Sequence, residues 1–189
     1  MYTTTLSNTK FLVTAALMTA LCCIGTMVIK VPTPTMGYVH IGDGLVLLSG
    51  ILLGPVYGSL AGGFGSMLAD LLSGYLIFAP GTFLIKAGVA MIGGGSYCLL
   101  KKKVKNKKGS FLPLLLSSTL GELFMVGGYF LYNIFVISLT NGSFSSASLG
   151  SALTQSFVEI PFNIMQGITG VLFVIILLPL LNKRPNNTL

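Results

Sequence analysis

The segment GGFGSMLADLLSGYLIFAPGTFLIKAGVAMIGGG, residues 62–95, places one Asp and one Lys inside a stretch with the composition of a membrane span. Asp70 and Lys86 flank a short break at Ala79-Pro80-Gly81, so two hydrophobic helices are predicted to meet there in a tight hairpin. Ionisable groups inside spans usually face the protein interior, pair with each other and mark a substrate or ion path. We therefore expect an Asp70–Lys86 pair that holds the two helices of the hairpin together. Two alternatives remain open: the pair is purely structural, or it also contacts a ligand.

The composition of the whole chain places it in a bilayer. Of its 189 residues, 53% are hydrophobic and only 8% are charged, with a mean hydropathy of +0.88, whereas soluble domains carry about 25% charged residues. The net charge of +7 is concentrated in one run, KKKVKNKK at 101–108, which follows a hydrophobic span and indicates a cytoplasmic loop. We expect no nucleic-acid partner and a single membrane domain over residues 1–189.

Hydrophobic segments and their breaks predict an all-α integral membrane protein with six transmembrane helices. Both termini are predicted to be cytoplasmic, because nearly all Lys and Arg residues outside the spans then lie on the inner side. The loops at 31–43, 78–81 and 140–151 then share the outer face. The predicted helices cover residues of about 10–29, 44–53, 56–76, 82–100, 111–139 and 152–181.

Helical rise puts several polar residues at a similar depth. Asp70 lies roughly 21 Å above the cytoplasmic start of its helix, in an apolar core about 30 Å thick. Lys86 and Glu159 lie roughly 6 to 10 Å inward from the outer ends of theirs. Convergent polar groups in an apolar cavity are typical of a small-molecule site. The predicted cluster also includes Tyr129, Asn133 and Asn163.

Three other positions are open to more than one interpretation. His40, the single histidine, lies in the loop 31–43 with Asp43, and that loop is either a turn in which Asp43 caps the next helix or a lid over a site. Glu159 has no further cation nearby to pair with, so it is a better candidate for a ligand contact than the members of the Asp70–Lys86 pair. Glu122 lies near mid-membrane, where we favour a structural role.

Motifs of enzymes are absent from the sequence. There is no G-x-x-x-x-G-K-[ST] loop, no H-E-x-x-H and no G-x-S-x-G, and the cysteines lack the spacing of metal ligands. We therefore expect no catalytic residues, no metal and no cofactor in this chain. A binding subunit that takes its energy from partners fits best, with a solitary carrier or channel, or a small membrane enzyme, as alternatives.

Three segments carry a family likeness: YVHIGD at 38–43, LLGPVYGSLAGGFGSMLADLLSGY at 52–75 and APGTFLIKAGVAMIGG at 79–94. Together they resemble the substrate-binding S components of energy-coupling factor (ECF) vitamin transporters. The resemblance implies a six-helix protein of the bacterial cell membrane that captures a vitamin at its outer side. It also implies docking through the first helix, at Ala16 and Ala20, onto a transmembrane coupling subunit, while two partner ATPases use ATP and Mg²⁺ to drive release.

The same resemblance implies a site built by the first outer loop, the last three helices and the loop before the last helix. The substrate is expected to be hydroxymethylpyrimidine or pyridoxine, because the likeness is greatest to S components of that type. Pantothenate comes next, and riboflavin is less expected because the chain has no Trp to stack on a larger ring system. The implied substrate-binding residues are His40, Lys86, Tyr129, Asn133, Glu159 and Asn163.

Overall fold

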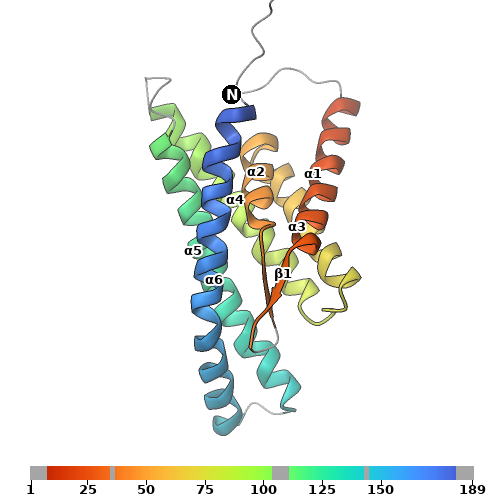
Figure 1. Cartoon of the computed structure of the whole chain (residues 1–189), viewed down its shortest axis with the longest axis vertical. Coiled ribbons are helices and arrows are strands. Elements are labelled where there is room, and N and C mark those ends of the chain that lie inside the picture. Colours follow the sequence, from red (N-terminus) through yellow and green to blue (C-terminus); the bar gives the residue numbers. More distant parts are fainter. Residues whose placement is uncertain (1–7, 35–36, 104–110, 143–144, 182–189) are drawn as a thin grey trace, which may run out of the picture.

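The computed structural model describes residues 8–34, 37–103, 111–142 and 145–181. These residues form a bundle of helices with one short β-hairpin (Figure 1). The predicted all-helical architecture is confirmed. The elements are α1 (Asn8–Val28), β1 (Lys30–Pro32), β2 (Tyr38–His40), α2 (Asp43–Leu53), α3 (Pro55–Leu72), α4 (Ala79–Lys103), α5 (Phe111–Thr140) and α6 (Ser146–Leu181).

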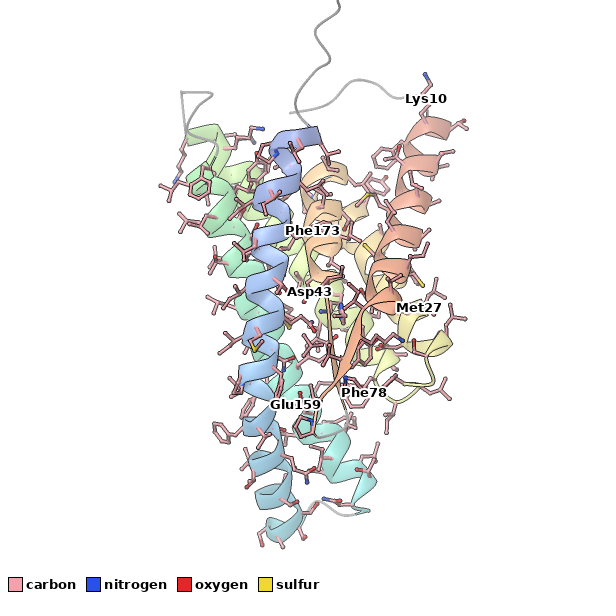
Figure 2. All side chains as sticks on the ribbon, in the orientation of Figure 1. Lys10, Met27, Asp43, Phe78, Glu159 and Phe173 are labelled. Carbon is pink, nitrogen blue, oxygen red and sulfur yellow. The ribbon has the colours of Figure 1, made fainter. Side chains whose placement is uncertain are left out.

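The surface of the bundle suits a bilayer. The helices α1, α4, α5 and α6 are long and apolar enough to span a membrane, and α2 is a shorter apolar helix of 11 residues. Large hydrophobic side chains are exposed on the outer faces of the helices, as in Leu84, which is 68% exposed. Figure 2 shows these side chains projecting outward along the whole bundle. In water such a surface would be unfavourable, whereas lipid tails solvate it.

The helix boundaries differ most from the sequence prediction around the turn between α3 and α4, where α3 ends at Leu72 instead of about residue 76, and at the start of α6. The chain reverses over residues 73–78, and Ala79-Pro80-Gly81 form the first turn of α4 rather than a break. Proline is well tolerated there because the first N–H groups of a helix have no intrahelical acceptor. Helix α6 begins at Ser146 instead of about residue 152, so the second half of the predicted loop at 140–151 belongs to this helix.

The short helix α2 lies at the centre, where it contacts α1, α3, α4 and α6. Glycines allow this close packing. A Cβ atom built on Gly50 would lie 2.0 Å from the carbonyl oxygen of Ala90, and one built on Gly58 would lie 2.4 Å from the Cα of Gly50. The backbones of α2, α3 and α4 are therefore in direct contact, which fixes how these helices are rotated.

The segment between α1 and α2 is a β-hairpin rather than the irregular loop that was expected. Strands β1 and β2 pair antiparallel, with Lys30 opposite His40 and Pro32 opposite Tyr38. In Figure 1 the hairpin descends from the middle of the bundle alongside α6, away from the end that holds the start of α1. It covers a space between α3, α4, α5 and α6.

Candidate functional site

A cavity of about 40 Å³ lies beneath the hairpin. This volume admits only a few water molecules, so a vitamin could enter only if part of the lining moved. Its aromatic wall consists of Tyr38, Tyr75, Phe78 and Tyr129. The polar groups that line it are His40, Asp70, Thr82, Asn133, Glu159, Asn163 and Gln166.

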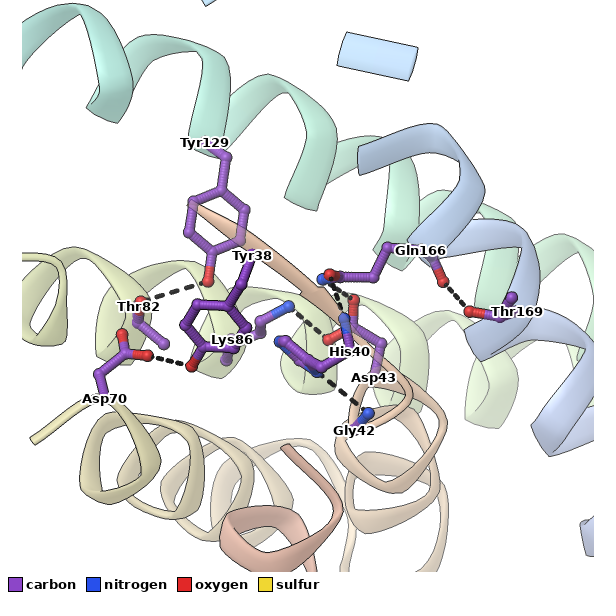
Figure 3. A network of polar contacts seen from close by, with 10 residues as sticks. All are labelled: Tyr38, His40, Gly42, Asp43, Asp70, Thr82, Lys86, Tyr129, Gln166 and Thr169. Carbon is purple, nitrogen blue, oxygen red and sulfur yellow. Dashed lines mark hydrogen bonds and ion pairs between the residues drawn. The ribbon is translucent and has the colours of Figure 1, made fainter. Parts of the chain in front are cut away.

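Behind the cavity lies a buried ion pair between Lys86 and Asp43 (Figure 3). Both side chains are fully buried. The second oxygen of Asp43 accepts a hydrogen bond of 2.8 Å from Gln166 Nε2, and the ammonium of Lys86 lies 5.1 Å from the centroid of the Tyr129 ring. The charge of Lys86 is thus balanced by Asp43, and a bound ligand is not needed for that purpose.

His40 joins this network to the hairpin. Its backbone N–H donates to Gln166 Oε1 at 3.0 Å, and its Nδ1 accepts the N–H of Gly42 at 3.0 Å. Burial, with the nearby charge of Lys86 as the next cause, lowers the pKa of His40 to about 3. The imidazole is therefore neutral near pH 7, with its proton on Nε2, and it adds no positive charge to the cavity.

The hairpin is tied to both sides of the cavity through carboxyl groups. The hydroxyl of Tyr38 donates to Asp70 Oδ1 at 2.5 Å, and the hydroxyl of Thr33 donates to Glu159 Oε1 at 2.6 Å. Burial raises the pKa of Tyr38, with the neighbouring Asp70 as the next cause, so its hydroxyl remains a donor. The hairpin thus donates one hydrogen bond to each of the two carboxyl groups, Asp70 and Glu159, in the described lining.

Five of the six residues predicted to bind substrate are brought together here, and one is not. His40, Tyr129, Asn133, Glu159 and Asn163 all line the cavity. Lys86, in contrast, lies behind its wall and is fully buried against Asp43.

The predicted Asp70–Lys86 pair is wrong. Lys86 pairs with Asp43, and Asp70 lines the cavity as the acceptor for Tyr38. The physical reason is the central position of α2, whose first residue is inserted between α4 and α6. The capping role considered for Asp43 is also wrong, because the N-cap of α2 is Gly42 and no side chain caps that helix end.

Several lining residues were not among the predicted site residues. Tyr75 and Phe78 belong to the turn before α4, where the sequence shows no more than an apolar segment. Gln166 lies seven residues after Glu159 and three after Asn163, so it shares their polar helix face, and that face was the signal for it. Glu122 does not line the cavity; it is buried, and neither of its oxygens has a hydrogen-bond partner within the described segments.

The site combines aromatic faces with neutral amides, hydroxyls and two carboxyl groups. Within the described residues, no group of three or more His, Cys, Asp or Glu side chains could hold a metal ion. The fold and the site together define a class: a small helical membrane protein that encloses a polar cavity beneath its hairpin.

Comparisons with known proteins identify the family. The family model described as "ECF-type riboflavin transporter, S component" matches residues 6–183. The chain belongs to this family of ECF transporter S components. Such proteins are substrate-binding, non-catalytic transport subunits for vitamin uptake that work with the coupling and ATPase module of an ECF transporter.

Two solved structures share the fold. One is the S component of a bacterial ECF transporter, with a TM-score of 0.64, 23% identity, and 94% of this chain and 100% of that chain covered. The other is the S component for biotin from an ECF-type ABC transporter, with a TM-score of 0.61, 21% identity, and coverage of 95% and 96%. An uncharacterised protein of Pyrococcus woesei is 36% identical over 107 residues, which are 56% of this chain and only 66% of that relative.

Proposed function

We propose that this S component captures a small, water-soluble vitamin or vitamin precursor in the cavity beneath its hairpin. The observation that carries the proposal is the cavity itself, where aromatic rings and convergent polar groups from β2, α4, α5 and α6 meet inside an otherwise apolar bundle. His40, Tyr129, Asn133, Glu159 and Asn163 are proposed to contact the ligand, together with Asp70. Lys86 is proposed to hold Asp43, and through it Gln166, in place.

We further propose six membrane-spanning segments in one domain, with both termini in the cytoplasm of a bacterial cell. The basic end of the bundle supports this topology: Lys10 and the lysines at 101–103 lie at the end away from the hairpin. The hairpin and its cavity then face the outside, where a vitamin would be captured.

Docking onto the coupling subunit is proposed to use α1. Ala16 and Ala20 both lie on the exposed face of this helix, four residues apart, and small residues at that spacing let another helix approach closely. Two partner ATPases are proposed to supply the energy, since this chain has no P-loop motif. We also propose that the chain itself uses no cofactor.

For the ligand itself we propose hydroxymethylpyrimidine or pyridoxine. The family description names riboflavin and one structural neighbour binds biotin, but a likeness below 25% identity supports the fold rather than the ligand. A single ring of either proposed compound could stack on Tyr38, Tyr75 or Tyr129 and use the surrounding amides.

The test is to purify the protein, identify any retained small molecule by native mass spectrometry, and titrate vitamins by calorimetry. We expect one vitamin to bind tightly, and uptake into proteoliposomes to require the coupling module and ATP. Uptake by this chain alone would favour a solitary carrier, and product formation without ATP would favour an enzyme. A protein that binds none of the vitamins would refute the proposal.

A further inference from the structure

We propose that this cavity selects its ligand by charge: it accepts uncharged or cationic rings that carry N–H or O–H donors, and it rejects ligands that carry a carboxylate. Asp70 and Glu159 are the groups that make this selection. The inference rests on the proposed function, because it concerns which vitamins the same cavity can hold.

Among the described residues, the lining contains acidic groups and no basic side chain that is charged. Asp70 from α3 and Glu159 from α6 both line the cavity, and no Lys or Arg is among the described residues that line it. The imidazole of His40 is neutral near pH 7. A ligand carboxylate would therefore meet two acidic groups without a lining cation to pair with, and placing like charges together weakens binding.

The two nearest cations are already engaged. The ammonium of Lys86 is fully buried in its ion pair with Asp43 and lies behind the lining. Lys30, on β1, donates to the hydroxyl of Ser73 and lies 5.1 Å from the centroid of the Tyr38 ring. Neither can be recruited by a ligand carboxylate without breaking a contact that the structure already makes, and for Lys86 the lost partner would be a buried charge.

Both acidic groups already act as acceptors, which shows what kind of ligand atom suits them. Asp70 accepts from the hydroxyl of Tyr38, and Glu159 accepts from the hydroxyl of Thr33. Both hydroxyls come from the segment that forms the hairpin. When the hairpin shifts to admit a ligand, the ligand's own N–H or O–H donors can replace them, so that neither acceptor is left unsatisfied. An amino group is well suited to this exchange, and a carboxylate cannot make it.

The aromatic wall favours the same ligands. Tyr38 packs against Tyr75 with ring centroids 4.7 Å apart, and Tyr129 completes the wall from α5. The faces of such rings carry partial negative charge, so they attract a cationic or electron-poor ring and repel an anion. The aromatic wall and the two acidic groups thus both favour uncharged or cationic ligands over anions.

The experiment titrates the purified full-length protein in detergent with vitamins of three kinds. Pyridoxine, hydroxymethylpyrimidine and riboflavin are uncharged overall, pyridoxamine is cationic, and pantothenate, biotin and 4-pyridoxic acid carry a carboxylate. We expect the tightest ligand to come from the first two kinds and every carboxylate compound to bind about 100-fold more weakly or worse. Tight binding of a carboxylate compound would overturn the inference and leave the proposed function intact. If no compound binds, the proposed function itself fails.

Variants then assign the selection to the two acidic groups. Glu159→Gln and Asp70→Asn are each expected to lower the affinity for the preferred ligand by about 10- to 100-fold. Each should also reduce the ratio between that affinity and the affinity for the carboxylate compounds. The matched control is Glu122→Gln, which makes the same chemical change at a buried carboxyl that is not among the lining residues of the cavity and is expected to bind within about 3-fold of the wild type. Equal losses in Glu159→Gln and the control would contradict the assignment.

A second variant keeps the inference testable if the carboxyl substitutions impair folding. Thr33→Val removes the hydroxyl that competes for Glu159 while it preserves side-chain shape. We expect it to bind the preferred ligand about 3- to 10-fold more tightly, because the ligand donor no longer displaces a bonded hydroxyl. Weaker or unchanged binding would argue against exchange at Glu159.

Discussion

Replacement of Lys86 by Met tests the central ion pair most directly. The side chains of Lys86 and Asp43 are both 0% exposed, and Met keeps much of the volume of Lys without its charge. Asp43 would then remain buried and would keep the hydrogen bond of 2.8 Å from Gln166 Nε2. Removal of one partner from a buried ion pair typically costs about 3–5 kcal/mol, because the other charge is left uncompensated.

The assay is unfolding in detergent, followed by far-UV circular dichroism. For a chain of this size, about 1 kcal/mol corresponds to a shift in Tm of about 2–4 °C, so Lys86→Met is expected to lower Tm by about 6–20 °C. The matched control is Lys101→Met, which removes a cation from the exposed end of α4, where it lies 5.1 Å from the centroid of the Tyr97 ring. That control should change the free energy of unfolding by less than about 0.5–1 kcal/mol.

A double-mutant cycle identifies the partner of Lys86. Asp43→Asn should recover part of the loss in the Lys86→Met background, which gives a coupling energy of about 2 kcal/mol or more. Asp70→Asn should couple to Lys86→Met by less than about 1 kcal/mol. If Asp70 showed the larger coupling, or if Lys86→Met unfolded at the wild-type temperature, the ion pair described here would be refuted.

Three further predictions concern other contacts. Gly50→Ala should lower the free energy of unfolding by about 1–3 kcal/mol in the same assay, because its Cβ would lie 2.0 Å from the carbonyl oxygen of Ala90. Wild-type stability would exclude this close contact. In the unfolded chain, His40 binds a proton below about pH 6.5. In the folded chain it binds a proton only near its lowered pKa of about 3. Between these two pH values the free energy of unfolding should therefore fall by up to about 1.4 kcal/mol for each pH unit of acidification. His40→Asn, which retains an acceptor for the Gly42 N–H, should show a shallower slope in unfolding midpoint against pH; an unchanged slope would contradict the neutral buried imidazole. Tyr132→Phe should cost about 0.5–1.5 kcal/mol, since its hydroxyl donates at 2.7 Å to a backbone carbonyl in the turn before α4, and an unaltered unfolding curve would show that this bond adds nothing.

The candidate site was partly predictable because helical periodicity is local. Glu159 and Asn163 lie four residues apart, as do Tyr129 and Asn133, so each pair necessarily shares a helix face. Polar residues on a membrane helix turn inward because lipid cannot satisfy them. These two facts were enough to predict four lining residues without any knowledge of the neighbouring helices.

The partners of those residues could not be predicted in the same way. Periodicity says which residues share a face, but not which other helix that face meets. Lys86 and Asp70 are close in sequence across one turn, and this proximity favoured the wrong pair. Gly50 packs directly against Ala90 and Gly58, so α2 lies at the centre of the bundle. In this position the side chain of Asp43 is next to that of Lys86.

The sequence by itself thus determined a helical membrane protein with a polar face on each of its later helices, because hydropathy and the period of the helix are properties of short segments. Only the tertiary structure decided that the hairpin of β1 and β2 folds over the cavity and bonds Asp70 and Glu159, and that Lys86 is withdrawn from the cavity by Asp43. These features join residues up to 126 positions apart. They depend on how closely helix backbones approach, which no short segment encodes.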